Sequence, residues 1–303
     1  MRIASTQYHA TMNTALQKAN ERLSDILQKM ASGEKFSLPS EDPVGAVRLS
    51  RLTREEAALV QYRENIATLK GRLSQNEAFL DGMISDMTSA RDLLVWALDG
   101  SNTAADINAM ASSIQPIIDS LFYAANSRDA EGRYLFSGTL SDTAALTYDP
   151  AAALGARYTY TGNAGRQLVA VAAGVQQAAN VTVQEMAAML NQLDQVRAVL
   201  SAPGVSANDP VVRAELQAAL NVTDQTLNVT AGKIAGLGGA QNILSTLDAN
   251  HQNISLSNRQ AALVVGQLDY ADAAVKLNGY TTSVQATQKA YAQVSKLSLF
   301  EAM

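Results

Sequence analysis

A long stretch without proline, residues 44–98, carries an apolar residue at almost every seventh position, and a second series follows three residues later in each repeat. This spacing is typical of helices that pack along a seam. A helix over residues 43–99 would be about 85 Å long, far longer than usual in a globular domain. The pattern therefore predicts an elongated helical rod. Its expected core residues are Leu59, Ile66, Leu69, Leu73, Leu80, Met83, Met87 and Leu94.

Asn76 is the polar member of this seam. A buried asparagine at such a position can fix the register of packed helices at a cost in stability. The alternative is that Asn76 faces solvent at an irregular point of the seam.

The two ends of the chain carry the same kind of apolar repeat. A helix is expected over residues 6–31, and Gly33 follows it as a left-handed cap. A last helix is expected over residues 241–300, after three glycines between residues 236 and 239 weaken or end the preceding one. The positions that would pack the ends together, termed here the assembly seam, are Met12, Leu16, Leu23, Ile26, Tyr270, Leu277, Tyr280, Val284, Tyr291 and Val294.

An isolated helix is marginal in water and gains most of its stability by packing its apolar face. Residues 1–42 and 260–303 are therefore expected to form a coiled coil with each other. Because each end needs a partner, we expect both to be poorly ordered in the free monomer and to become ordered on assembly.

A loop is expected between the first two helices. Pro39 disfavours helical geometry for the residue before it. Asp42 is a favourable N-cap, and Pro43 suits the first position of a helix. These three residues form the loop motif of the sequence. Asp209 and Pro210 repeat the same chemistry, so another helix is expected to begin there.

The middle of the chain differs in composition. A third helix is expected over residues 104–129, kinked at Pro116. Residues 132–182 are then rich in glycine, threonine and β-branched residues. Alternation in residues 157–161 and 167–171, separated by a glycine-containing loop, predicts a hairpin between these two segments. A further strand near residues 175–183 and a helix over residues 183–202 would follow.

These patterns together predict a mainly α fold with a small β-rich insertion. The expected architecture is an elongated helical bundle or coiled coil formed by the N- and C-terminal helices. Three parts are expected. They are terminal coiled-coil segments (1–42 with 260–303), a helical rod domain (43–131 with 183–259) and a β-rich outer insertion (132–182).

Composition argues against several function classes. The chain has no cysteine, which excludes disulfides and thiol chemistry. A net charge of −5, with both signs interspersed, does not suggest a nucleic-acid binder. No stretch is long and apolar enough for membrane insertion, and the N-terminus lacks the apolar core of a signal peptide.

No catalytic, cofactor-binding or metal-binding motif is present. The two histidines, His9 and His251, are expected at polar helix surfaces, and Trp96 is expected in the core or between helices. The sequence therefore predicts no enzyme and no cofactor.

Four segments resemble one family. Residues 1–7 resemble the start of the flagellin-like axial proteins. Residues 32–46, with Pro39, Asp42 and Pro43, resemble a loop of the hook–filament junction proteins within that family, although Phe36 and Leu38 replace more polar residues. Residues 132–138 (GRYLFSG) and 297–303 (LSLFEAM) are similar to two further segments of the same proteins. Residues 139–182 match no part of the family.

This resemblance implies a secreted structural protein of the bacterial flagellum, located at the hook–filament junction. It implies the first hook-associated protein, flagellin and neighbouring copies of the chain as partners. It also implies an export chaperone and the flagellar type III route. Two alternatives remain: a flagellin that builds the filament itself, and a type III-secreted helical binding protein. An enzyme ranks last.

Overall fold

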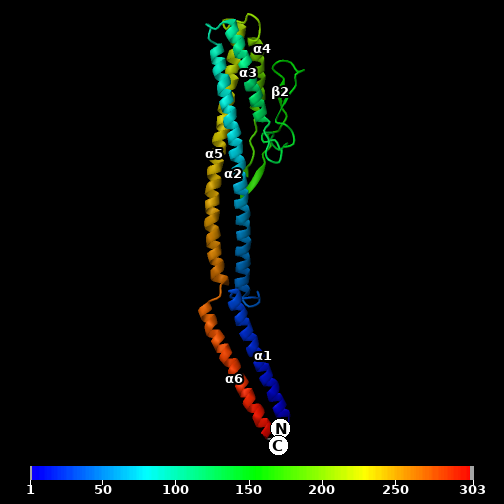
Figure 1. Cartoon of the computed structure of the whole chain (residues 1–303), viewed down its shortest axis with the longest axis vertical. Coiled ribbons are helices and arrows are strands. Elements are labelled where there is room, and N and C mark those ends of the chain that lie inside the picture. Colours follow the sequence, from blue (N-terminus) through cyan, green and yellow to red (C-terminus); the bar gives the residue numbers. More distant parts are fainter. Residues whose placement is uncertain (1, 301–303) are drawn as a thin grey trace. The chain divides into compact units, whose positions relative to one another are not determined.

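The computed structural model describes the backbone of residues 2–300 and the side chains of residue 7 and residues 9–293 (Figure 1). Helices make up 70% of the chain, which confirms the mainly α class. None of the described helices combines the length and the apolar character needed to cross a membrane. The helices are α1 (Arg2–Ser32), α2 (Pro43–Ala97), α3 (Ala104–Ala125), α4 (Glu185–Leu200), α5 (Pro210–Gly266) and α6 (Tyr270–Phe300).

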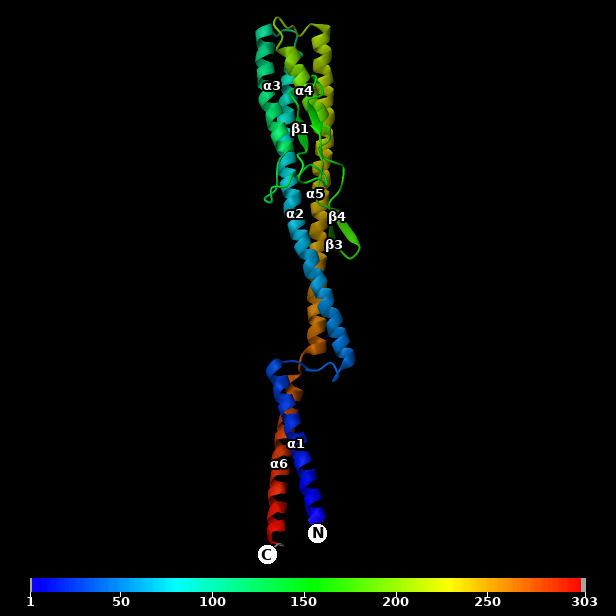
Figure 2. The same ribbon diagram turned by 90° about the vertical axis from the view of Figure 1, so that its right-hand side faces the viewer.

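The chain divides into two compact units, residues 60–251 and residues 1–59 with 252–303. In the first unit, α3 and α4 pack together beside α2 and α5, as both views show (Figures 1 and 2). The seam side chains of α2 from Ile66 to Leu94 are at most 2% exposed. The apolar repeat therefore faces a continuous core, which also includes Ile107, Ile114, Ile118, Leu121, Met186, Leu193 and Leu216.

The β-rich insertion contains two hairpins, and the predicted pairing is wrong. The strands are β1 (Leu146–Tyr148), β2 (Tyr158–Tyr160), β3 (Leu168–Ala172) and β4 (Val175–Ala178). Strand β2 pairs antiparallel with β1, and β3 pairs antiparallel with β4.

Two local features explain this pairing. Gly174 has a φ of 72°, which permits a tight turn between β3 and β4. The glycine-containing loop before β3 does not turn the chain back. Its Asn163 side chain instead accepts a hydrogen bond from the Thr139 amide and donates one to the Thr139 hydroxyl. The loop is therefore held against the segment that precedes β1.

Two helix ends also differ from the sequence-based expectation. Helix α5 continues through the glycines at positions 236, 238 and 239. The neighbouring Leu237 and Ala240 are at most 8% exposed, so packing outweighs the low helix propensity of glycine there. Helix α3 continues through Pro116 but ends at Ala125 rather than at residue 129.

The end of α5 lies instead at Gly266, within the segment expected to be one last helix. The Asp269 carboxylate accepts hydrogen bonds from the amides of Ala271 and Asp272 and so caps the start of α6.

Trp96 and His251 also lie in environments that the sequence did not predict. Trp96 is 59% exposed, because the seam positions beside it, Leu94 and Ala97, take the buried places. His251 is only 6% exposed, and its Nε2 lies 2.8 Å from the carbonyl oxygen of Val171 in β3. The side-chain Nδ2 of Asn65 donates a hydrogen bond to the neighbouring Ala170 carbonyl at 2.8 Å. Two helical side chains thus hold β3 against α2 and α5.

Asn76 is fully buried, which excludes the solvent-facing alternative. Neither its side-chain nitrogen nor its side-chain oxygen has a hydrogen-bond partner among the described residues. Replacing Asn76 by leucine is expected to raise the free energy of unfolding by about 1–3 kcal/mol, because the desolvation cost of two unpaired polar atoms disappears. Urea unfolding monitored by circular dichroism measures this change.

The matched control is Gln75→Leu at the adjacent exposed position, where a change within about 0.5 kcal/mol is expected. A loss of stability in Asn76→Leu that exceeds the change in the control would contradict this account.

Candidate assembly interface

The terminal helices α1 and α6 lie side by side in the unit formed by residues 1–59 and 252–303 (Figures 1 and 2). Ile26 of α1 and Val284 of α6 are 5% and 8% exposed. The rings of His9 and Tyr291 pack edge to face, with their centroids 5.6 Å apart. Six of the predicted seam side chains are half-buried: Met12, Leu16, Leu23, Leu277, Tyr280 and Tyr291. Tyr270 is half exposed, and the side chain of Val294 lies outside the described residues.

Few of the described side chains are buried between the two helices of this pair. Among the described side chains of α1, only Ile26 is buried, and in α6 only Ala273 and Val284 are buried. The rest of the seam keeps apolar surface in contact with solvent. Because a helix pair depends on burying this face, two helices alone leave the seam incompletely covered.

The loop motif caps the start of α2. The Asp42 carboxylate accepts a 2.8 Å hydrogen bond from the Gly45 amide, which is the N-cap geometry expected from the sequence. A Cβ atom at Gly45 would lie 2.6 Å from the Asp42 carboxylate and 3.1 Å from the Phe36 ring. Phe36 therefore packs on the first turn of α2. Pro39 and Pro43 are exposed.

Lys29 joins this loop to α1. Its ammonium group lies 2.7 Å from Glu41 and 3.0 Å from Asp25. The hydrogen bond from Lys29 lowers the pKa of Glu41, and the same contact raises the pKa of Lys29. Because the pKa of Glu41 is lower in the folded state, its contribution to stability is present above the pKa of an unfolded glutamate, about 4.3. Because the pKa of Lys29 is higher in the folded state, its contribution is present below the pKa of an unfolded lysine, about 10.4. Both groups are therefore charged, and the ion pair contributes its full stabilisation, between about pH 5 and pH 10.

The two helix connections of this unit are bonded to each other. The Lys35 amide donates to the Gly266 carbonyl at 2.8 Å, and the Leu268 amide donates to the Gly33 carbonyl at 2.9 Å. Gly33 has a φ of 75°, a conformation that favours glycine. The Tyr270 hydroxyl donates to the Met30 carbonyl at the end of α1. No sequence signal identified this pairing, because backbone bonds across more than 230 residues leave no side-chain pattern.

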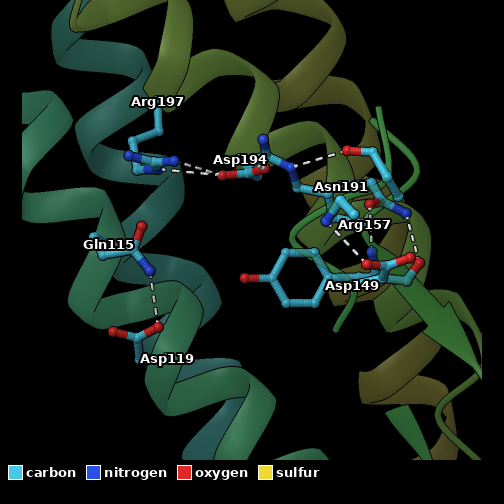
Figure 3. A network of polar contacts seen from close by, with 10 residues as sticks. Gln115, Asp119, Asp149, Arg157, Asn191, Asp194 and Arg197 are labelled. Atoms are coloured by element: carbon cyan, nitrogen blue, oxygen red, sulfur yellow. Dashed lines mark hydrogen bonds and ion pairs between the residues drawn. The ribbon is translucent and has the colours of Figure 1, made fainter. Parts of the chain in front are cut away.

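A separate polar network lies in the unit of residues 60–251 (Figure 3). Asp194 of α4 is 3% exposed and accepts from Arg157 at 3.2 Å and from Arg197 at 2.7 Å. The Asn191 side chain accepts from the Tyr158 amide and donates to the Tyr158 carbonyl. Burial raises the pKa of Tyr158 to about 12, so its hydroxyl stays protonated at physiological pH. The network attaches β2 to α4.

No group of three or more potential metal-ligating side chains occurs among the described residues. The feature that repeats along the terminal helices is a row of half-buried apolar side chains. Such a row can bind another helix but carries no reactive group.

Comparisons with known proteins agree with this architecture. The model of the bacterial flagellin N-terminal helical region matches residues 3–141. Flagellar hook-associated protein 3 of Escherichia coli K12 is 25% identical over 289 residues, which cover 90% of each chain. A solved structure assigned as a flagellar hook-associated protein of Vibrio parahaemolyticus is 35% identical. That match covers 74% of this chain and 99% of the other, with a TM-score of 0.67.

The terminal helix pair, the capped loop and the flagellin-type N-terminal region define a flagellin-like helical protein. Polar flagellin C of Vibrio parahaemolyticus matches only 44% of this chain, at 25% identity. The chain belongs to the flagellar hook-associated proteins, and flagellar hook-associated protein 3 is the name of its relative that matches across 90% of both chains.

Proposed function

We propose that this protein is a structural adaptor that joins the flagellar hook to the filament. The observation that carries the proposal is the incompletely covered seam of α1 and α6, which leaves apolar surface for helices of neighbouring subunits. The similarity to hook-associated protein 3 over nearly the whole chain supports the adaptor over a flagellin, whose match spans less than half of it.

The partners follow from this position. Copies of the chain pack through their terminal helices into a ring. The first hook-associated protein contacts the ring on the hook side, and flagellin contacts it on the filament side. Heterologous contacts between identical subunits close into a ring or extend into a helix. An export chaperone and the flagellar type III route deliver the subunit to the outside of the cell.

Each part of the chain has its own role in this proposal. Residues 1–42 and 260–303 are the assembly segments, and the assembly seam is their contact surface. The loop motif fixes where α2 begins beside them. Residues 43–131 with 183–259 form the rod that carries load between hook and filament, and residues 132–182 form the outer insertion. No part of this work requires catalysis.

Electron microscopy of a strain that lacks this protein tests the function. The expected result is intact hooks without filaments, with flagellin released into the medium. Expression of the full chain should restore the filaments. Shortened or thinned filaments would identify a flagellin instead, and unchanged motility would identify a secreted binding protein.

We also expect the terminal helices to be only marginally stable in the free monomer. Backbone amides of α1 should exchange hydrogen on the order of 100-fold faster than those of residues 80–94, because a helix pair with few buried side chains opens at low free energy. Hydrogen exchange followed by mass spectrometry measures both segments in one sample, so the core of α2 is the internal control. Equal protection of the two segments would contradict the proposal.

A further inference from the structure

Asn278 and Gly279 lie in the middle of α6, between the seam residues Leu277 and Tyr280. Asn278 is the one asparagine of the sequence that is followed by glycine. Its side chain is exposed, and no hydrogen bond to another of the described residues holds it. A Cβ atom added at Gly279 would meet no neighbouring element within 4 Å. The side-chain amide of Asn278 and the peptide group that follows it are therefore open to solvent.

This pair of residues has an intrinsic chemistry. When the backbone leaves helical geometry, the Gly279 amide nitrogen can attack the side-chain carbonyl carbon (Cγ) of Asn278. A bond forms between this nitrogen and Cγ, the bond from Cγ to the side-chain nitrogen breaks, and ammonia leaves with the proton of the Gly279 amide. Water then opens the cyclic imide and leaves aspartate or isoaspartate at position 278. Glycine favours the attack because it has no Cβ atom to crowd the nitrogen.

The α-helix itself prevents this reaction. Each amide within a helix points along the axis toward the carbonyl four residues earlier. The Gly279 nitrogen is therefore held away from the Asn278 side chain, and its hydrogen is already bonded. The rate of the reaction consequently depends on how often α6 opens around these two residues.

The middle of α6 has few contacts that oppose such opening. Ala273 and Val284 are about 16 Å apart along the helix axis, and none of the described side chains between them is buried. Asparagine, glycine and threonine all have low helix propensity. The Thr282 hydroxyl donates to the Asn278 carbonyl at 2.8 Å, and a bond of this kind slightly destabilises a helix. Local opening around Asn278 is therefore expected to cost little free energy in a free subunit.

We propose that Asn278 is a site of spontaneous modification, at which the side-chain amide becomes a carboxylate in free subunits and is protected in assembled ones. The protection rests on the proposed function, because it requires neighbouring subunits to pack on the assembly seam and hold α6 closed. Isoaspartate adds one carbon atom to the main chain and so interrupts the hydrogen-bond ladder of the helix. Aspartate is a poor helix former and adds a negative charge. Either product weakens the helix that assembly requires.

Ageing of the purified full chain at growth temperature in mildly alkaline buffer tests the inference. Peptide mass spectrometry measures loss of the side-chain amide at each asparagine, and labelling by a protein isoaspartate methyltransferase detects the second product. Flagella sheared from cells are kept in the same buffer for the same time. Asn278 is expected to react at least about tenfold faster in the free chain than in the flagella, because assembly suppresses local opening of α6.

Asn126 is the internal control. It also precedes a small residue, Ser127, but its side chain donates to the Leu146 carbonyl and accepts from the Leu146 amide. No measurable reaction is expected there. Gly279→Ala is the matched variant, because its methyl group enters open space, crowds the attacking nitrogen and strengthens the helix. The reaction at Asn278 should then be at least about fivefold slower in the free chain.

The outcomes separate this inference from the proposed function. A free chain in which Asn278 reacts no faster than Asn126 would show that Asn278 is not a modification site. Equal rates in the free chain and in the flagella would show that assembly does not protect it. Either result overturns the inference and leaves the adaptor role intact. If the full chain restores no filaments to the strain that lacks it, the adaptor role itself fails, whatever the reactivity of Asn278.

Discussion

Cells that carry Ile26→Asp in place of the native protein are expected to have hooks without filaments and not to swim. Ile26 is 5% exposed and is the buried residue of α1 among its described side chains. A carboxylate at this point would be buried against α6 without a partner, which costs several kcal/mol. Among the described side chains of α1 no other is buried, so no other contact of this kind offsets that cost. Electron microscopy and a swimming assay in soft agar measure the effect.

Leu27→Asp is the matched control. Leu27 is the next residue of the same helix and is 49% exposed, so the carboxylate there faces solvent and leaves the packing of α1 on α6 intact. Immunoblots of the medium show whether both variants are exported, and thermal melts show whether residues 60–251 stay folded. Normal filaments in the Ile26→Asp strain would contradict the role of the assembly seam.

Asp194→Ala is expected to lower the free energy of unfolding of the unit of residues 60–251 by about 3–5 kcal/mol. The substitution leaves Arg157 and Arg197 without the carboxylate that both contact, in a place where Asp194 is 3% exposed. For a unit of this size, the melting temperature should fall by roughly 6–20 °C. Circular dichroism during urea and thermal unfolding measures both quantities.

The control is Asp224→Ala, which removes another aspartate from an arginine pair. Asp224 and Arg91 are 41% and 42% exposed at their side chains, so their pairing contributes about 0–1 kcal/mol. An equal loss of stability in the two variants would contradict the claim that the buried Asp194 network attaches β2 to α4. Local proteolysis of residues 142–182 in Asp194→Ala would show the detachment of the insertion directly.

The helical core could be predicted because its signal is local. A residue seven positions along a helix returns to the same face, so the repeat from Leu59 to Leu94 marks the buried side without knowledge of the partner helix. Caps are equally local, and Asp42 with Pro43 marks the start of α2 from two adjacent residues.

The strand pairing could not be predicted in this way. Residues 157–161 and 167–171 alternate as strands do, but alternation does not say which strand lies opposite. That choice depended on the tight turn at Gly174 and on the Asn163 contacts with Thr139. The environments of Trp96 and His251 depended likewise on which neighbouring positions took the interior.

The candidate interface combines both kinds of information. The assembly seam follows from the helical repeat of each chain end. The pairing of the two connections, through Gly33, Lys35, Gly266 and Leu268, joins segments that are distant in sequence.

The sequence alone determined the mainly α class, the buried face of α2 and the loop between the first two helices, because helix period and capping act over a few residues. The tertiary structure decided where α5 ends, which strands pair, and that Trp96 faces solvent while His251 is buried. Those outcomes depend on contacts between distant segments, whose energies no local pattern of side chains records.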